Sequence, residues 1–195
     1  SKEYESFPLT EIQHAYLVSR GDSSSQATVG TTYCQIFAVD EIDLDRLDAA
    51  WGKVQKRHGM MRASVDEDGT QSIAPSSKIG HIERAECANS SEAKQQLEEI
   101  KRTVFALAKP PLHRVVSISW HEESGKQTRL VFCFDYTVLD ALSVMTVLAE
   151  LAELYENPGA DLPGIGLTFR DFVVGHRRDG REVEDCLLYT SPSPR

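Results

Sequence analysis

A nearly unbroken apolar stretch at residues 129–134 is the strongest indication of how this 195-residue chain folds. A strand that carries apolar side chains on both faces must be covered on both sides, so the stretch indicates the central strand of a buried sheet. Residues 112–120 have the composition of a neighbouring strand, and residues 123–126 form the turn between the two. The sequence therefore predicts a sheet enclosed by helices.

Helical periodicity identifies the enclosing layers. Thr10 and Gln13 form a capping box that begins a helix running to about Ser19. Further helices are predicted over residues 44–58, 88–108 and 141–157. The apolar stripe of the helix over 44–58 contains Leu44, Leu47, Ala50, Trp51 and Val54. The apolar positions of the helix over 141–157 are Leu142, Met145, Leu148, Ala149, Ala152 and Tyr155.

The remaining segments complete the predicted organisation. Residues 33–39 have strand composition, and residues 62–65 and 71–73 are predicted to form a hairpin around a link rich in Asp and Gly. Residues 21–30 are expected to form a loop, and residues 168–174 one more short element. Residues 186–195 show no helical or strand period and resemble translated sequencing-adapter sequence. We therefore expect one domain over residues 1–180 and a partly non-native tail over residues 181–195, with the natural protein continuing past this break.

Composition and charge narrow the function classes. The formal net charge of -9 disfavours binding to nucleic acid and to anionic lipid. No run approaches the ~18 apolar residues of a membrane span, and the first residues lack the apolar core of a signal peptide, so we expect a soluble cytoplasmic protein. The four cysteines lie far apart in the sequence and form no C-x-x-C pair, so neither a disulfide framework nor a zinc site is indicated and free thiols are expected. No glycine-rich phosphate loop indicates a nucleotide.

The segment 134–143, between the apolar strand and the last predicted helix, is the candidate site. Asp135 and Asp140 lie there, and a carboxylate at a helix start meets free backbone N–H groups and the positive end of the helix dipole. A purely structural alternative exists, in which Asp140 is a helix N-cap and Asp135 a turn residue. Spacing alone does not separate the two.

Four motifs in order resemble those of heterocyclization domains of nonribosomal peptide synthetases. Residues 7–20 resemble F-P-L-T-x-x-Q-x-A-Y-x-x-G-R, with Ser19 in place of the glycine. Residues 57–62 resemble R-H-x-M-L-R, with Met61 in place of leucine and a D-G-x-Q at 68–71. Asp135 and Asp140 match the D-x-x-x-x-D signature with Ser143 three residues on, and residues 169–173 resemble F-R-D-[YF]-V.

The resemblance implies an α+β, chloramphenicol-acetyltransferase-like sandwich of two lobes, of which this chain is the N-terminal lobe. It implies a domain that joins a carrier-bound acyl or peptidyl thioester to a Cys, Ser or Thr thioester and closes the side chain into a thiazoline or oxazoline. The expected partners are carrier proteins, the missing C-terminal lobe and neighbouring synthetase domains. Substrates would arrive on phosphopantetheine arms, with no cofactor or metal bound directly. The fragment alone is expected to be inactive.

The resemblance also assigns the site residues. Ordinary condensation domains have H-H-x-x-x-D-G here, so Asp135 replaces the first histidine and Tyr136 the second. Asp135 and Asp140 are the predicted catalytic residues. A carboxylate is a poor base at neutral pH unless its pKa is raised, and Asp135 is the candidate for such a rise. Arg62 and Ser143 are predicted to provide structural support, and we hypothesise that Arg62 pairs with Asp140.

Other residues and other functions are weaker candidates. His14, His58 and Cys133 are more often packed or solvated side chains than functional ones, and Trp51 and Tyr155 are expected to be packing residues. An ordinary condensation or acyltransferase lobe would need a histidine where Tyr136 stands. A noncatalytic docking lobe for carrier proteins is the third alternative.

Overall fold

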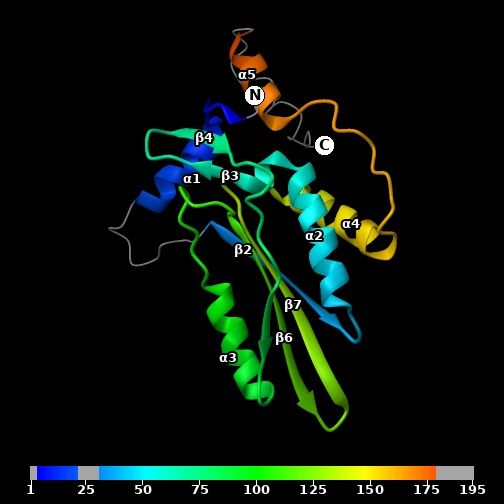
Figure 1. The fold of residues 1–195 in the computed structure, drawn as a ribbon. Helices are drawn as coiled ribbons and strands as arrows, with labels where there is room; N and C mark the ends of the chain where they lie inside the picture. Colours follow the sequence, from blue (N-terminus) through cyan, green and yellow to red (C-terminus); the bar gives the residue numbers. More distant parts are fainter. Residues whose placement is uncertain (1–3, 22–30, 179–195) are drawn as a thin grey trace, which may run out of the picture.

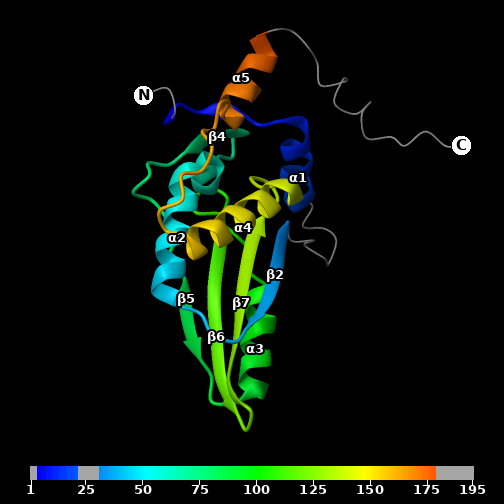
Figure 2. The same ribbon diagram turned by 90° about the vertical axis from the view of Figure 1, so that its right-hand side faces the viewer.

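A four-stranded mixed sheet lies at the centre of the computed structural model, which describes residues 4–21 and 31–178. The strand order is β2 (Thr32–Val39), β7 (Gly125–Asp135), β6 (His113–Glu122) and β5 (Glu83–Glu86). β7 pairs antiparallel with both of its neighbours, and β5 pairs parallel with β6. Helices α2 (Leu44–Arg57) and α4 (Ala141–Glu156) cover one face, and α3 (Ser90–Lys101) covers the other (Figures 1 and 2). The apolar segment is therefore a covered central strand, as predicted.

The two faces of β7 bury alternate residues against different helices, because successive side chains of a strand point to opposite sides. On the α2 and α4 side, the Trp51 ring lies 5.8 Å from that of Phe132 and 6.3 Å from that of Phe134. On the α3 side, Val131 and Cys133 pack with Ile100. Each fully buried side chain of this size stabilises the fold by about 1.5–3 kcal/mol. These two clusters hold the end of β7 rigidly in place.

A second, smaller sheet lies near the end of β7 where the candidate site begins. It consists of β1 (Phe7–Pro8), β4 (Thr70–Ile73) and β3 (Ala63–Val65), with the 3-10 turn η2 (Gly59–Arg62) before β3. The β3–β4 hairpin is confirmed, and Gly69 in its turn has φ +79°, a conformation that favours glycine. Helix α5 (Phe169–Arg178) packs against β1 through Val173.

Helix α1 (Glu11–Gly21) begins with the predicted capping box. The backbone N–H of Gln13 donates to Thr10 Oγ1 at 3.3 Å, and the backbone N–H of Thr10 donates to Gln13 Oε1 at 3.0 Å. These two bonds satisfy donors that a helix start otherwise leaves free.

The predicted helix over residues 88–108 is wrong in its second half, because α3 ends at Lys101. The hydroxyl of Thr103 turns back onto the carbonyl of Ile100, and Val65 N–H bonds to the carbonyl of Leu107. Tertiary contacts therefore draw this backbone away from the helix. Strands β1 and β5 were not predicted; β5 reads Glu-Arg-Ala-Glu and carries no apolar alternation.

The predicted apolar face of α4 is also wrong. The buried side chains are Val144, Val147, Leu151 and Leu154, whereas Leu142 and Met145 are 72% and 68% exposed. The helix carries apolar residues all round, and such a sequence is typical of a helix that is covered on more than one side.

Free thiols were predicted for all four cysteines, and this is wrong for two of them. The β2–β7 register places Cys34 directly opposite Cys133 with a Cα–Cα distance of 4.1 Å, and the two form a disulfide. Two cysteines 99 residues apart become neighbours only because β2 joins the sheet beside β7. Cys87 is a free thiol, and burial raises its pKa.

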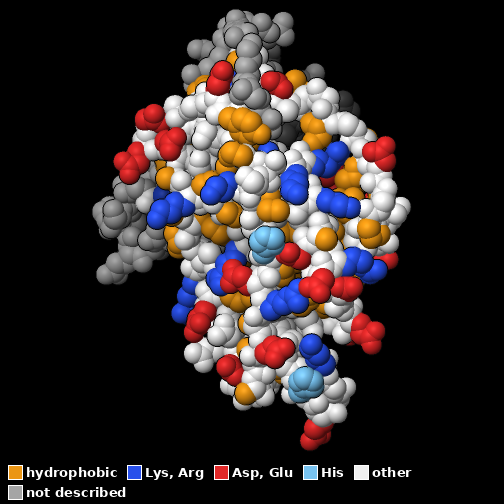
Figure 3. Space-filling view, viewed as in Figure 1, with side chains coloured by type: hydrophobic (Ala, Val, Ile, Leu, Met, Phe, Trp, Pro, Cys, Tyr) orange, Lys and Arg blue, Asp and Glu red, His pale blue; other side chains and the backbone are white. Residues whose placement is uncertain are grey.

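Acidic and basic side chains are interspersed over the face shown in Figure 3. Among the helices at residues 4–21 and 31–178, none is both long and apolar enough to cross a bilayer. The predicted loop at 21–30 and the tail at 181–195 lie almost wholly outside the described residues, so the boundary at residue 180 stays a prediction.

Candidate active site

The turn between β7 and α4 brings together residues from four distant parts of the chain. Asp135 is the last residue of β7, and its backbone N–H donates to the carbonyl of Leu112 at 3.0 Å. Its own carbonyl accepts from the N–H groups of Val138 and Leu139, and the N–H of Tyr136 donates to the carbonyl of Thr31 at 2.9 Å. The backbone is thus fully engaged on both sides of Asp135, so its side chain has one defined position.

The carboxylate of Asp135 is completely buried and accepts from three groups. Arg20 Nη1 lies 2.6 Å from Oδ2, while Thr31 Oγ1 and the N–H of Thr137 each lie 2.9 Å from Oδ1. Arg20 also donates to Thr31 Oγ1 and to the carbonyl of Phe105. A buried carboxylate needs partners of this kind, and this set ties α1, β2 and the β7–α4 turn together.

Sequence reasoning missed Arg20 and Thr31 as partners of Asp135. Arg20 is the last residue of the motif over residues 7–20, so the sequence pointed to Arg20 as a fixed position of the motif. It did not indicate that Arg20 pairs with Asp135. Thr31 precedes β2 in a stretch with no distinguishing pattern, and only the pairing of β2 with β7 places it here.

Asp140 has a different role from Asp135. It is exposed, and its Oδ1 accepts from the backbone N–H of Ser143 at 2.7 Å as the N-cap of α4. The predicted support from Ser143 is therefore a backbone contact. The structural alternative, in which Asp140 is an N-cap, describes this geometry.

The hypothesis that Arg62 pairs with Asp140 is wrong. Arg62 is buried, and its guanidinium donates to the backbone carbonyls of Gln55, Lys56 and Ala74. Both residues are described, and no ion pair joins them. Because Asp140 is solvated and capped onto α4, it needs no buried cation. Arg62 instead ties the end of α2 to Ala74, the residue directly after β4.

The buried side-chain amides of Gln13 and Gln71 support the same turn. Gln13 Nε2 donates to the carbonyl of Thr137 at 2.8 Å, and the Gln13 and Gln71 side chains exchange hydrogen bonds at 2.9 Å. The hydroxyl of Thr137 is buried without a hydrogen-bond partner among the described residues. Gln13 and Gln71 both fall in the quoted motifs, so their presence was visible in the sequence, but their mutual contact was not.

Tyr136, the residue directly after Asp135, stacks on Tyr33 with a centroid distance of 5.5 Å. Burial, together with the neighbouring Tyr33 and Tyr16, raises the pKa of the Tyr136 hydroxyl. The group therefore stays protonated at neutral pH and can donate a hydrogen bond, but it is not a base.

The other candidates lie elsewhere. His58 contacts Glu150 at 2.6 Å, and Glu150 is about 15 Å along α4 from Asp140 at the rise of a helix. His14 is exposed on α1, Trp51 is in the core, and Tyr155 holds Arg46 over its ring. A hollow of about 440 Å³ lies between α2 and the segment after α4, and one of about 330 Å³ lies beside α3. Neither includes a residue of the segment 135–143.

Comparison with known proteins agrees with this architecture. The family model of the condensation domain matches residues 3–185. The chain belongs to the condensation-domain family. Its fold is the chloramphenicol-acetyltransferase-like fold of nonribosomal peptide synthetase condensation domains, and the structure corresponds to one lobe.

Similarities to individual proteins are more specific than the family match. The chain is 30% identical to phenyloxazoline synthase MbtB of Mycolicibacterium paratuberculosis over 100% of its own length and 16% of that protein. It is 30% identical to bacitracin synthase 1 of Bacillus licheniformis over 88% of its length and 3% of that protein. The cyclization-docking bidomain of EpoB from Sorangium cellulosum superposes with a TM-score of 0.81 at 28% identity, covering 93% of this chain and 37% of that one. The condensation-type lobe thus spans a small part of each relative.

The N-cap role of Asp140 predicts a small and specific stability effect. Replacing Asp140 by Ala removes the acceptor for Ser143 N–H and is expected to lower the unfolding free energy by about 1 kcal/mol. Asp140→Asn, the matched control, keeps an acceptor of similar capping strength and is expected to cost less than half as much. Urea unfolding of both variants measures this difference. Equal losses would show that the charge, and not the cap, is what stabilises α4.

Proposed function

We propose that this chain is the N-terminal lobe of a heterocyclization domain. The complete domain condenses a carrier-bound acyl or peptidyl thioester with a carrier-bound Cys, Ser or Thr and then closes the side chain onto the new amide with loss of water. The observation that carries the proposal is the Asp135-to-Asp140 turn, where a carboxylate and a tyrosine stand in place of the two histidines of ordinary condensation domains.

The geometry of that turn supports a chemistry without a histidine base. Asp135 is occupied by Arg20, Thr31 and Thr137, so we assign it as a positioning residue that fixes the turn. Tyr136 offers a protonated hydroxyl. The assignment of Asp135 and Asp140 as catalytic residues stays a prediction, and the experiment below separates it from the positioning role.

Two named relatives support ring formation over simple condensation. One is a phenyloxazoline synthase, and the superposed structure is a cyclization-docking bidomain. Bacitracin synthase 1 matches at the same identity as the phenyloxazoline synthase, and its name specifies no ring, so identity alone does not establish ring formation for this chain. The residues of the turn support heterocyclization as the proposed reaction.

The exposed side of α4 supports the proposal that further polypeptide completes the site. Leu142 and Met145 follow Asp140 directly, and the exposed positions Ala149 and Ala152 continue the same apolar side. Exposed apolar faces of this kind mark surfaces that another element covers. Since this chain covers 37% of the EpoB bidomain, we propose that the second lobe of the domain is that element. Carrier proteins would deliver substrates on phosphopantetheine arms to the space between the lobes.

The test uses the longer protein that contains both lobes, with loaded donor and acceptor carrier proteins. Mass spectrometry of the carrier-bound product separates the amide from the ring, because ring closure removes one water. We expect both products from the intact domain and none from the 195-residue chain alone. Amide without ring would identify an ordinary condensation domain, and neither product would favour a docking lobe.

Single variants then assign the two aspartates. Asp140→Asn keeps the N-cap and is expected to leave both reactions within a few-fold of the parent protein. Asp135→Asn is expected to lower amide formation and ring closure in parallel with stability, as a positioning role requires. Selective loss of ring closure in a stably folded Asp135→Asn domain would make Asp135 a catalytic residue.

A further inference from the structure

The disulfide between Cys34 and Cys133 lies next to the support of Asp135. In the β2–β7 register the pairs Thr32↔Asp135, Tyr33↔Phe134 and Cys34↔Cys133 follow one another. β2 is an edge strand of the sheet, so β7 alone holds it by backbone hydrogen bonds among the described strands. The residue just before β2, Thr31, donates to the Asp135 carboxylate and accepts from the Tyr136 N–H. The cross-link thus lies three residues from Thr31 on one strand and two residues from Asp135 on the other.

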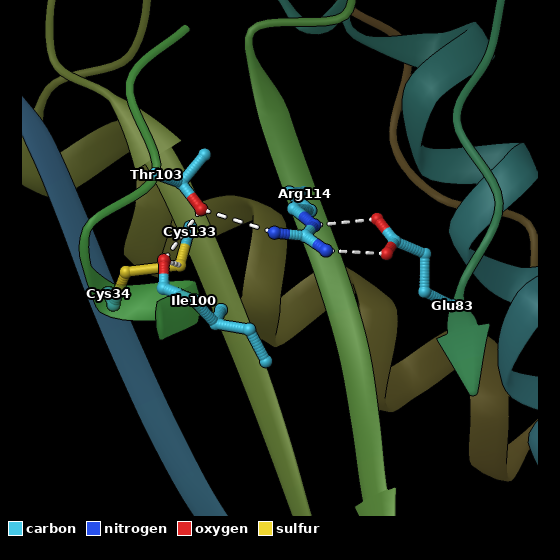
Figure 4. Close-up of a disulfide and its surroundings, with 6 residues drawn as sticks. All are labelled: Cys34, Glu83, Ile100, Thr103, Arg114 and Cys133. Atoms are coloured by element: carbon cyan, nitrogen blue, oxygen red, sulfur yellow. Dashed lines mark hydrogen bonds and ion pairs between the residues drawn. A yellow bond between two sulfur atoms is a disulfide. The ribbon is translucent and has the colours of Figure 1, made fainter. Parts of the chain in front are cut away.

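The two sulfur atoms have unequal access. Cys133 is completely buried beside the carbonyl of Ile100, whereas Cys34 on the edge strand is partly exposed. Figure 4 shows the disulfide on the α3 side of the sheet, with Arg114 on the neighbouring strand bonded to Glu83 and Thr103. An incoming thiolate can therefore reach Cys34 more easily than Cys133.

We propose that Cys34 and Cys133 form a reversible redox switch that controls how firmly β2 holds the Asp135 turn. A low-molecular-weight thiolate such as glutathione attacks Cys34 Sγ, and the S–S bond breaks as Cys133 leaves and takes up a proton. A second thiol then cleaves the mixed disulfide, so two thiols are oxidised to one disulfide and the protein gains two S–H groups. Oxidation by glutathione disulfide reverses both steps.

The cross-link closes a long loop, because its cysteines are 99 residues apart, and such loops gain most from closure. Where a disulfide occurs in a reducing compartment, it is usually transient and redox-sensing rather than permanent. An edge strand with one partner is also the part of a sheet that opens most easily. Reduction is therefore expected to loosen β2 and leave the β6–β7 pair intact.

The test begins with the 195-residue chain purified without reductant. After denaturation and treatment with N-ethylmaleimide, peptide mapping is expected to find Cys87 modified and Cys34 linked to Cys133. The reduced protein is expected to melt about 5–15 °C below the oxidised protein. Amide hydrogen exchange is expected to accelerate in β2 on reduction but not in β6. Modification of both Cys34 and Cys133 in the protein purified without reductant would overturn the cross-link.

Two variants and one titration make the test specific. Cys34→Ser is expected to melt at the temperature of the reduced protein, with or without reductant. Cys87→Ser, the control, is expected to keep the full reductant-dependent shift. Equilibration against graded glutathione to glutathione disulfide ratios is expected to give a reversible midpoint between fully reduced and fully oxidised protein. A disulfide that persists at every ratio is a permanent structural bond and would overturn the switch, as would a melting temperature that reductant does not change.

Discussion

Replacing Arg20 by Met is expected to lower the free energy of unfolding by about 3–5 kcal/mol, because it leaves the Asp135 carboxylate buried without its cation. Arg20 is 15% exposed and Asp135 is fully buried, so solvent screens this pair little. The same change removes the hydrogen bonds from Arg20 to Thr31 and to the Phe105 carbonyl. Urea denaturation of the variant and the parent chain under identical conditions measures the loss.

Two further variants separate the buried charge from the loss of an arginine in general. Arg84→Met breaks the exposed Arg84–Asp45 pair, whose side chains are 50% and 88% exposed, and is expected to leave the stability essentially unchanged. Asp135→Asn is expected to cost less than Arg20→Met, because the amide oxygen still accepts from Thr31 and Thr137. If Arg20→Met and Arg84→Met cost the same, the ion pair does not hold the turn.

Acidification from pH 7.5 to pH 5 is expected to cost about 2 kcal/mol through His113 alone. Burial lowers the pKa of His113 to about 4, and a hydrogen bond with the Met61 backbone opposes this only in part. The folded protein therefore keeps the imidazole neutral while the unfolded chain binds a proton below about pH 6.5. Stability from this source is complete above pH 6.5 and is lost as the pH falls towards 4.

Unfolding free energies of His113→Gln at the two pH values test this assignment. The variant is less stable at pH 7.5, because the ring packs at 5.1 Å from Trp51, but its loss on acidification is expected to be smaller by about 2 kcal/mol. His121→Gln, at an exposed position on the same strand, is expected to keep the parental pH dependence. An unchanged pH dependence in His113→Gln would show that other groups bind the protons.

Local sequence patterns predicted most of the elements, because local chemistry determines where they begin and end. The Thr10–Gln13 box and the apolar core of β7 gave correct elements. The prediction failed where tertiary contacts decide. α3 stops at Lys101 although its helical pattern continues, and α4 buries the opposite side of an evenly apolar helix. Periodicity cannot choose a face when both faces are apolar.

The turn between β7 and α4 that carries the candidate site was predicted, but the contacts of its side chains were not. The strand-to-helix turn and the N-cap of Asp140 follow from short-range rules. Arg20, the ion-pair partner of Asp135, lies on α1, and Cys34, the disulfide partner of Cys133, lies on the edge strand β2. Both contacts depend on how distant segments of the chain are arranged around the sheet. Pairing Arg62 with Asp140 was wrong because Arg62 is buried and bonds to the carbonyls of Gln55, Lys56 and Ala74, whereas Asp140 is exposed at the start of α4.

β2 can pair with β7 only late in synthesis, because β7 lies far along the chain, and this affects folding on the ribosome. β2 leaves the exit tunnel early, yet its hydrogen-bonding partner β7 spans Gly125–Asp135 and leaves much later. During that interval the nascent chain presents an unpaired strand to its surroundings, and non-local pairing of this kind folds slowly. Neighbouring ribosomes on one messenger would then hold identical unpaired strands close together, so spacing between them, or a chaperone, protects the yield of folded protein.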